Sequence, residues 1–143
     1  MSAIISMYFI YTLGLTSQLF GGIAPIQYNN YGLFSSRFYT HKSDVQAIEW
    51  LSFNKVGNNN TYADTYASLK LLPYGGIQEG EYNTDILPPF ANSAYIFSTK
   101  SNLSDSLAFI QISNKEISFT FPIMYIDNNE NSIYSNGSSG IYR

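Results

Sequence analysis

The sequence contains no cysteine and a single histidine among its 143 residues. Without cysteine there is no disulfide, no thiolate nucleophile and no cysteine zinc site, and one histidine cannot build a histidine-rich metal centre. Lysine and arginine total only seven and the formal net charge is -3, so no basic patch is available to neutralise phosphates. We therefore expect no metal, no cofactor and no nucleic-acid partner.

Sequence motifs for phosphate binding and for hydrolysis are absent too. Neither G-x-G-x-x-G, G-x-x-x-x-G-K-[ST] nor G-x-S-x-G occurs. The acids Glu79, Glu81 and Asp85 lack the D-x-D-x-D-G spacing of a calcium loop, which favours a solvated loop. A hydrolase triad would have to use His41, and nothing in the sequence supplies partners for it. We predict no catalytic residue in this chain.

Aromatic residues are abundant at 17%, with thirteen tyrosines, whereas charged residues make up only 12%. A surface rich in tyrosine, asparagine and serine is polar through hydroxyls and amides rather than ions. Such surfaces are common where a protein meets glycans or the extracellular medium. Three N-x-[ST] sequons, at Asn59, Asn102 and Asn136, lie in loop-like stretches and are candidate N-glycosylation sites.

The N-terminal stretch is apolar, and no charged side chain precedes Arg37. Residues 3–20 have about the length that spans a bilayer. A secretory signal needs a basic start, which is missing here, and a membrane helix without a basic flank is typical of the last span of a longer protein. We expect a native start upstream of Met1, a transmembrane span in residues 1–24 and an extracytoplasmic domain in residues 25–143. The alternative is a buried apolar helix of a soluble domain.

A helix, a strand and a second helix are predicted after this stretch. Ser43 has a capping-box spacing to Gln46, and apolar residues then recur at helical spacing through residues 45–51. A polar loop at residues 54–60 leads to a strand at 61–63. Asp64 is the expected N-cap of a helix over residues 65–72, which Pro73 and Gly75-Gly76 are expected to end. This order predicts an α/β unit.

Strands dominate the remaining chain. Residues 73–90 are predicted to form a long loop, followed by strands at 94–98, 107–112 and 117–121, with a turn at 114–116. A polar loop is expected at 127–131, and the Asn136-Gly137 pair predicts a hairpin between residues 132–134 and 140–142. The predicted fold is α/β: a small sheet with flanking helices and a C-terminal hairpin, preceded by one apolar, transmembrane-like helix.

Three residues are weak ligand candidates, each with a simpler explanation. Asp64 lies where a strand passes into a helix, the place where α/β folds bind ligands, but a helix cap explains it as well. His41 beside Asp44 could form a proton-transfer pair, although a histidine before a helix is more often exposed or capping. Tyr62, with Trp50 and Tyr66, could offer a sugar-stacking surface, whereas core packing is the simpler role.

A series of short motifs resembles a known group of proteins. They are the apolar YFIYTLGL, the connector IAPIQYNNYG, R-x-Y-T, A-x-E-W-L, Y-A-D-x-Y and a closing I-Y-x-N-G-x-x-x-I-Y-R. Together they resemble the C-terminal end of archaeal multi-pass membrane proteins of uncharacterised function. Those proteins are similar in architecture to glycosyltransferases that use lipid-phosphate-linked sugars.

The resemblance implies an extracytoplasmic domain on the last membrane helix, close to surface glycan assembly. The catalytic acid of such glycosyltransferases is expected in an early loop of the membrane region, so no catalytic residue transfers to this chain. Implied partners are the membrane, a glycan or lipid-linked sugar, and a missing N-terminal membrane domain. The alternative is a cell-surface structural subunit of pilin type, in which residues 3–20 pack with copies of themselves. A soluble enzyme has no supporting motif.

Overall fold

The computed structural model describes residues 2–12, 37–57 and 59–143. The chain divides into two compact units, Met1–Tyr39 and Thr40–Arg143. Within the first, α1 (Ser2–Thr12) is an eleven-residue helix. Its exposed large apolar side chains are Ile4, Ile5, Met7, Tyr8, Phe9 and Ile10, with exposures from 42% to 76%. The helix therefore presents an apolar surface that its own unit leaves uncovered among the described residues.

The structure does not support the expected transmembrane helix. Among the described residues, no helix combines the length and apolar character needed to cross a membrane. The span was predicted over residues 3–20, and α1 covers only its first part, because eleven residues extend about 16 Å at 1.5 Å per residue. Residues 13–20 of the prediction lie outside the described residues.

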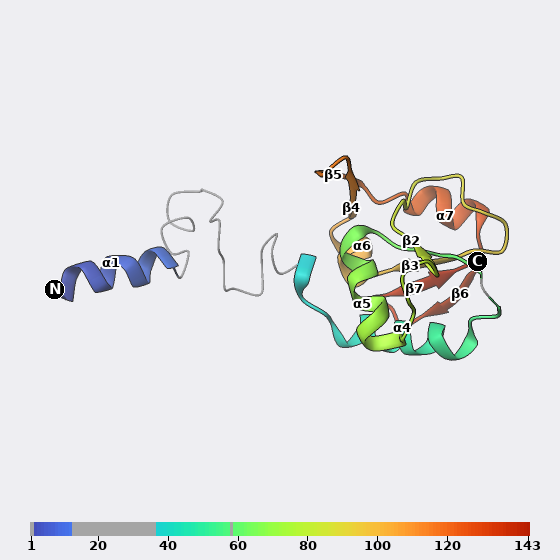
Figure 1. Ribbon diagram of the computed structural model, residues 1–143, viewed down its shortest axis with the longest axis horizontal. Helices are drawn as coiled ribbons and strands as arrows, with labels where there is room; N and C mark the ends of the chain where they lie inside the picture. The colour runs from blue at the N-terminus through green and yellow to red at the C-terminus, as the bar shows by residue number, and fades with distance from the viewer. Residues whose placement is uncertain (1, 13–36, 58) are drawn as a thin grey trace. The chain divides into compact units, whose positions relative to one another are not determined.

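The second unit is built on a mixed five-stranded sheet, as predicted for an α/β fold (Figure 1). Its order is β2 (Tyr82–Asn83), β1 (Thr61–Tyr62), β3 (Tyr95–Ser98), β7 (Gly140–Tyr142) and β6 (Ser132–Ser135). β1 pairs parallel with both β2 and β3, whereas β7 is antiparallel to β3 and to β6. The β6–β7 pair confirms the predicted C-terminal hairpin.

Four helices and a separate hairpin complete the second unit. The helices are α4 (Lys42–Asn54), α5 (Thr65–Gly75), α6 (Lys100–Ser104) and α7 (Ile123–Asn129). β4 (Leu107–Ile112) and β5 (Lys115–Thr120) form a two-stranded sheet of their own. Figure 1 shows α4 and α5 on one side of the five-stranded sheet, α7 on the other, and the β4–β5 hairpin apart from it.

The helix caps follow the prediction at α5 and depart from it at α4. Asp64 caps α5 as expected, because its carboxylate accepts a hydrogen bond from the N–H of Ala67 at 2.7 Å. α4, however, is capped by His41 rather than Ser43. The backbone N–H of His41 donates to the carboxylate of Asp44 at 3.2 Å, so Asp44 takes the capping-box position that was predicted for Gln46.

Proline does not end α5 where it was predicted to. Pro73 lies inside the helix, which continues to Gly75. The end is set by Gly76, whose φ of 66° is left-handed and whose N–H donates to the carbonyl of Leu72 at 3.0 Å. A glycine adopts this conformation without the steric cost that a side chain would add. Of the predicted stop signals, the glycine pair is therefore confirmed by Gly76, and Pro73 is wrong.

Two segments predicted as loops contain regular structure. Residues 73–90 include the end of α5 and strand β2, a two-residue edge strand held by backbone bonds from Thr61 to Glu81 and from Ala63 to Asn83. Residues 127–131 include the second half of α7, whose polar side chains face outward while Ile126 is fully buried. The sequence lacks a local signal for either element, because tertiary pairing creates the first and a single buried residue secures the second.

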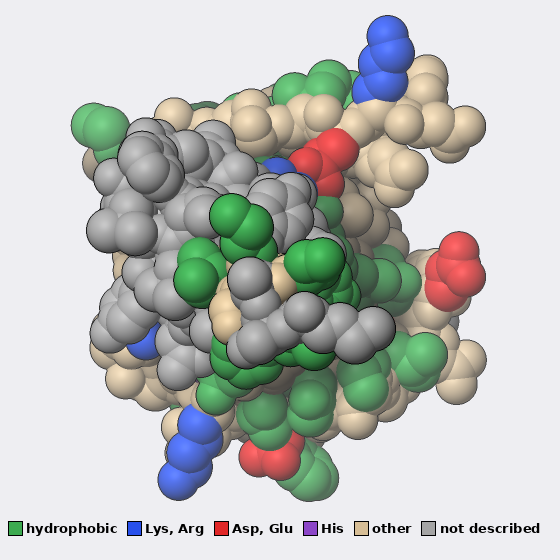
Figure 2. Space-filling view, turned by 90° about the vertical axis from the view of Figure 1, so that its left-hand side faces the viewer, with side chains coloured by type: hydrophobic (Ala, Val, Ile, Leu, Met, Phe, Trp, Pro, Cys, Tyr) green, Lys and Arg blue, Asp and Glu red, His purple; other side chains and the backbone are tan. Residues whose placement is uncertain are grey.

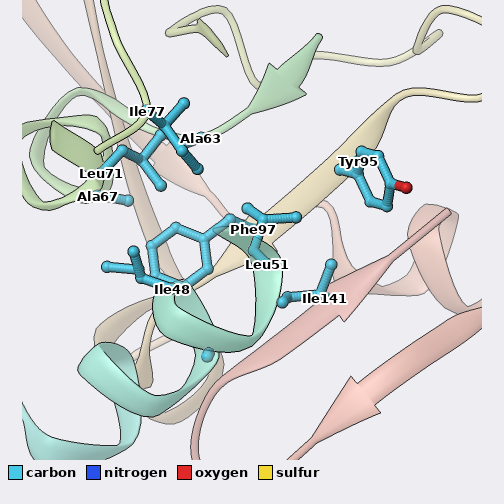
Figure 3. Close-up of a cluster of buried hydrophobic side chains, with 10 residues drawn as sticks. Ile48, Leu51, Ala63, Ala67, Leu71, Ile77, Tyr95, Phe97 and Ile141 are labelled. Atoms are coloured by element: carbon cyan, nitrogen blue, oxygen red, sulfur yellow. The ribbon is translucent and has the colours of Figure 1, made fainter. Parts of the chain in front are cut away.

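The core consists of two clusters on opposite faces of the sheet, separated by strand alternation. Tyr95 and Phe97 of β3 join side chains of α4 and α5, while Ile96 between them joins the other cluster. Figure 3 shows the first cluster, with side chains from α4, α5, β3 and β7 pointing toward one another. The second cluster comprises Ile86, Ile96, Ala108, Ile110, Phe121, Ile126 and Tyr142. Burial on both faces fixes the register of β3.

The β4–β5 hairpin begins in the second cluster and ends in solvent. Its two strands pair through six residues each, from Leu107↔Thr120 to Ile112↔Lys115. The turn consists of Ser113 and Asn114, with φ values of 49° and 64°. Positive φ at both central residues suits a tight hairpin turn, so β5 starts at Lys115 and not at the predicted residue 117.

Candidate functional site at the carboxyl ends of β1 and β3

Polar side chains gather where the parallel strands β1 and β3 end. Asp64 follows β1 and Thr99 follows β3, and each caps the helix that comes next. From β1 the chain passes outward to β2 and then returns to β3 on the other side of β1. Such a reversal of strand order is where α/β folds usually bind ligands, so this edge is the first place to test for a functional site.

Asp44 reaches this edge from the first turn of α4 and is completely buried. Oδ1 accepts from the backbone N–H of Lys100 at 2.9 Å and from the hydroxyl of Ser139 at 2.7 Å. Oδ2 accepts from the ammonium of Lys70 at 3.0 Å and from the backbone N–H of His41 at 3.2 Å. Four donors therefore occupy one carboxylate.

The charge of Asp44 is matched by Lys70, which is only 5% exposed. Burial alone would raise the pKa of Asp44. The Lys70 ammonium, together with the hydrogen bonds donated by Lys100 and Ser139, outweighs burial and holds the pKa of Asp44 below 3.8. Asp44 is therefore ionised at neutral pH and forms a buried ion pair between α4 and α5.

Asp64 lies in the same region without a cation bonded to it. Its side chain accepts from the N–H of Ala67, from the amide of Asn102 at 2.8 Å and from the backbone N–H of Phe109. Burial dominates and raises the pKa of Asp64 above 3.8, although these hydrogen bonds oppose the shift. Asp64 thus joins β1, α5, α6 and β4.

Asn102 in α6 is 1% exposed, and its amide group is fully used. Its nitrogen donates to Asp64 and to the carbonyl of Leu107, each at 2.8 Å. Its oxygen accepts from the backbone N–H and the hydroxyl of Thr99, at 2.9 and 2.8 Å. Attachment of a sugar would replace a hydrogen that is already donated, so the folded chain does not present Asn102 as a glycosylation site.

The other two predicted sequons lie nearer the surface. Asn136 is exposed in the β6–β7 turn, and its amide nitrogen donates to the carbonyl of Ser43 at 2.9 Å. Asn59 is half-buried in the segment before β1. The structure therefore keeps these two as candidates and separates Asn102 from them.

The predicted proton-transfer pair is a helix cap in the structure. His41 is half-buried, and the bond from its backbone N–H to Asp44 belongs to the capping box of α4. Burial, followed by the nearby Lys100 ammonium, lowers the pKa of His41 below 6.5. Because the Asp44 oxygens already accept from four donors, Asp44 is poorly placed to take up a proton from His41.

The three aromatic residues proposed as a sugar-stacking surface do not converge. Trp50 packs against Tyr134, Tyr62 against Phe90 and Tyr66 against Phe109, each pair with ring centroids 5.2 Å apart. Trp50 packs against the first core cluster and Tyr62 against the second, on the opposite face of the sheet. Tyr62 is therefore a partly buried packing residue, and no shared platform forms.

The acidic loop contacts its own backbone and Lys55, which lies 26 residues earlier in the chain. The Glu81 carboxylate accepts from the backbone N–H of Gln78 at 2.7 Å and lies 3.8 Å from the ammonium of Lys55. Within the described part of the chain, no three acidic, histidine or cysteine side chains are grouped closely enough to hold a metal ion. Glu79 and Asp85 are exposed, as expected for a solvated loop, whereas Glu81 is half-buried next to strand β2.

Sequence reasoning missed Lys70, Asn102 and Ser139, which complete the buried network. A local signal existed only for Asn102, since Thr99 and Asn102 have capping-box spacing. Lys70 and Ser139 follow Asp44 by 26 and 95 residues, so only folding brings them together. The bonds of Asp44 fasten α4, α5, α6 and the β6–β7 turn to one another. Beside this network, the buried hydroxyls of Thr61 and Thr65 have no hydrogen-bond partner in the described part of the chain.

Comparison of the sequence with protein-family models and with curated proteins, and of the fold with solved structures, gives no match.

Proposed function

We propose that this chain is a non-catalytic extracytoplasmic domain of an archaeal membrane protein, one similar to glycosyltransferases that use lipid-phosphate-linked sugars and that act in surface glycan assembly. One observation carries the proposal. Asp44, Asp64 and Asn102 at the carboxyl ends of β1 and β3 are engaged in internal bonds, while α1 exposes an apolar surface.

The buried edge supports a structural role for the domain. A general acid or base must reach the proton that it transfers, and a binding residue must offer a free donor or acceptor. Asp44, Asp64 and Asn102 are at most 3% exposed, and each is bonded to several protein groups. Such a domain is suited to holding a rigid surface next to a catalytic partner rather than to performing chemistry itself.

The apolar helix supports attachment to a membrane. A helix that is apolar all round needs an apolar environment, either inside a protein or in lipid. α1 carries six exposed large apolar side chains and no charged one. In the proposed protein, this end of the chain belongs to the membrane, and the α/β unit contacts the N-terminal membrane domain or a sugar acceptor outside it.

Partitioning of the purified chain tests this proposal. The full chain and a chain lacking residues 1–24 are compared by size-exclusion chromatography with and without detergent. We expect the full chain to require detergent and the shortened chain to be a folded monomer in buffer. A matched control replaces Ile5 and Phe9 by serine, which should weaken detergent binding without removing any residue.

Two other outcomes would contradict the proposal. A full chain that stays monomeric in buffer and unfolds when residues 1–24 are removed would make the N-terminal helix part of a soluble core. Regular filaments in electron micrographs of the detergent-free chain would instead favour the pilin-type structural subunit.

A further inference from the structure

One face of the β4–β5 hairpin is apolar along almost its whole length, although only the half near the base is buried in the core. Cross-strand pairing places one set of side chains on a single face: Ala108, Ile110, Ile112, Lys115, Ile117 and Phe119. Those near the base pack in the second core cluster. Farther out, Ile112 and Ile117 are 51% and 43% exposed. The outer half of this face is therefore an unpartnered continuation of a buried surface.

The opposite face of the hairpin is apolar at its base, where Leu107 and Phe109 lie, and polar toward the turn, where it holds the acid. Gln111 pairs with Glu116 on that face, and the Glu116 carboxylate accepts a hydrogen bond from the hydroxyl of Tyr66 in α5. The apolar face consequently contains one charged residue, Lys115, at the end next to the turn. An apolar face with a cation at its tip and its acid turned away differs from an ordinary solvated hairpin.

This pattern matches a lipid surface better than a protein groove. Lysine can lay its methylene chain along apolar surroundings while its ammonium reaches anionic headgroups. The same chain exposes a second apolar surface on α1. In Figure 2, hydrophobic side chains and a few separate charged side chains of the described residues reach the surface.

We propose that the outer half of the β4–β5 hairpin, with Ile112, Ile117 and Lys115, inserts into the lipid surface to which the chain is attached. This rests on the proposed function, since two half-exposed isoleucines bind lipid only weakly alone. Attachment through the N-terminal segment supplies the missing affinity, because a tethered contact forms at high effective concentration. The hairpin would then set the orientation of the domain on the membrane.

The absence of cysteine makes a direct test possible. Ser113→Cys at the turn and, as control, Ser118→Cys on the polar face each carry one environment-sensitive fluorophore on the full chain. The labelled proteins are reconstituted with phosphatidylcholine vesicles, with or without phosphatidylglycerol, that contain a spin-labelled quencher lipid. We expect a blue shift and lipid quenching at position 113, stronger with phosphatidylglycerol, and a much smaller effect at position 118.

A second variant tests whether the isoleucines are responsible. Ile112→Ser combined with Ile117→Ser should lower the ratio of inserted to free hairpin by about tenfold, which corresponds to about 1.4 kcal/mol. The matched control is Gln111→Ser, which alters the polar face of the same strand and should leave quenching unchanged. Urea unfolding of each variant verifies that the domain remains folded.

Flotation of the same vesicles separates this proposal from the proposed function. If the chain floats with the vesicles while the label at position 113 stays in water, the hairpin contact is wrong and membrane attachment stands. If the chain does not float, both fail. A blue shift without lipid quenching that grows with protein concentration would identify a second copy as the occupant and would overturn lipid insertion.

Discussion

The two hairpins of the domain differ in how they are attached to the rest of the fold. β6–β7 lies at the edge of the five-stranded sheet, whereas β4–β5 stands apart as a sheet of two strands. Each is fastened by one buried aspartate. The comparison shows that the place at which a hairpin is attached, more than its own sequence, decides how much of it is buried.

The points of attachment differ. In β6–β7 the turn is tied down, because Ser139 donates to Asp44 and Asn136 donates to the carbonyl of Ser43. In β4–β5 the base is held by the amide of Asn102, which donates to the carbonyl of Leu107, and by the backbone N–H of Phe109, which donates to Asp64. Nearer the turn, the Tyr66 hydroxyl of α5 donates to the Glu116 carboxylate on one face of the hairpin. The other face near the turn, with Ile112 and Ile117, remains 51% and 43% exposed.

The two aspartates also differ in charge balance. Asp44 has the Lys70 ammonium at 3.0 Å, and its pKa is lowered. Asp64 is bonded only to neutral donors, and burial raises its pKa. The β6–β7 hairpin is thus held by the Asp44–Lys70 ion pair, whereas β4–β5 is held by Asp64, whose pKa is raised. Experiments can use this difference to distinguish the two hairpins.

The largest effect is expected from Asp44→Asn. The substitution leaves the Lys70 ammonium buried without its counter-charge and places an amide nitrogen among donors, so it should reduce the free energy of unfolding by about 3–5 kcal/mol. Urea denaturation followed by the fluorescence of Trp50, the one tryptophan, measures the loss. A loss below about 1 kcal/mol would show that the ion pair does not hold this hairpin.

Asn102→Ala should come next. It removes the bonds to Asp64, Leu107 and Thr99 at once and leaves buried acceptors unpaired, with an expected cost of about 2–3 kcal/mol. Amide hydrogen exchange should increase most in β4 and β5, because their base loses its anchor. Uniform exchange across both hairpins would contradict separate anchoring.

A smaller loss is expected from Asp64→Asn, about 1 kcal/mol, since asparagine is a good helix cap and keeps one acceptor. The same urea titration gives the value, and Asp44→Asn serves as the matched comparison. Equal losses for the two substitutions would remove the electrostatic difference between the hairpins.

The two aspartates should also respond to pH with opposite signs. The raised pKa of folded Asp64 means that acidification toward 3.8 stabilises the wild type relative to Asp64→Asn, so the measured loss grows. The lowered pKa of folded Asp44 means that its contribution is present above 3.8 and disappears as the pH falls through the folded value, so the loss from Asp44→Asn shrinks there. Unfolding curves of the wild type, Asp64→Asn and Asp44→Asn are measured as the pH is lowered through 3.8. If the losses from the two substitutions change in the same direction, this reasoning is wrong.

The smallest effect is expected at the hairpin tip. Ile117→Thr keeps a β-branched residue in an exposed strand and should change the free energy of unfolding by no more than about 0.5 kcal/mol. Ile141→Thr is the contrasting control, since Ile141 in β7 is fully buried and should cost several times more. Similar losses for both would mean that the tip of β4–β5 is covered within the domain.

Local patterns predicted the parts of this fold that depend on near neighbours. A few adjacent residues were enough to predict three features: the Asp64 cap, the strand through Phe97 and the Asn136-Gly137 turn. The shift of the α4 cap from Ser43 to His41 was not predictable in that way. It follows from the burial of Asp44, whose partners Lys100 and Ser139 lie 56 and 95 residues away.

For Asp64 the sequence left two interpretations, a ligand-binding residue and a helix cap, and the structure shows the cap. Asp64 was placed correctly at the end of a strand, but its neighbour Asn102 was considered only as a sequon. Whether a polar residue at this edge faces a ligand or faces other side chains depends on packing from several elements, which a single sequence does not display.

Because Asn102 is buried, its amide nitrogen can either form the hydrogen bonds of the folded chain or carry a sugar, but not both. In a glycosylating compartment, a chain that closed α6 first would hide the amide from the transferase. A chain modified first would lose the bonds to Asp64 and Leu107 and with them the anchor of β4. Whether α6 closes before or after glycosylation would therefore decide whether a given molecule can complete its fold.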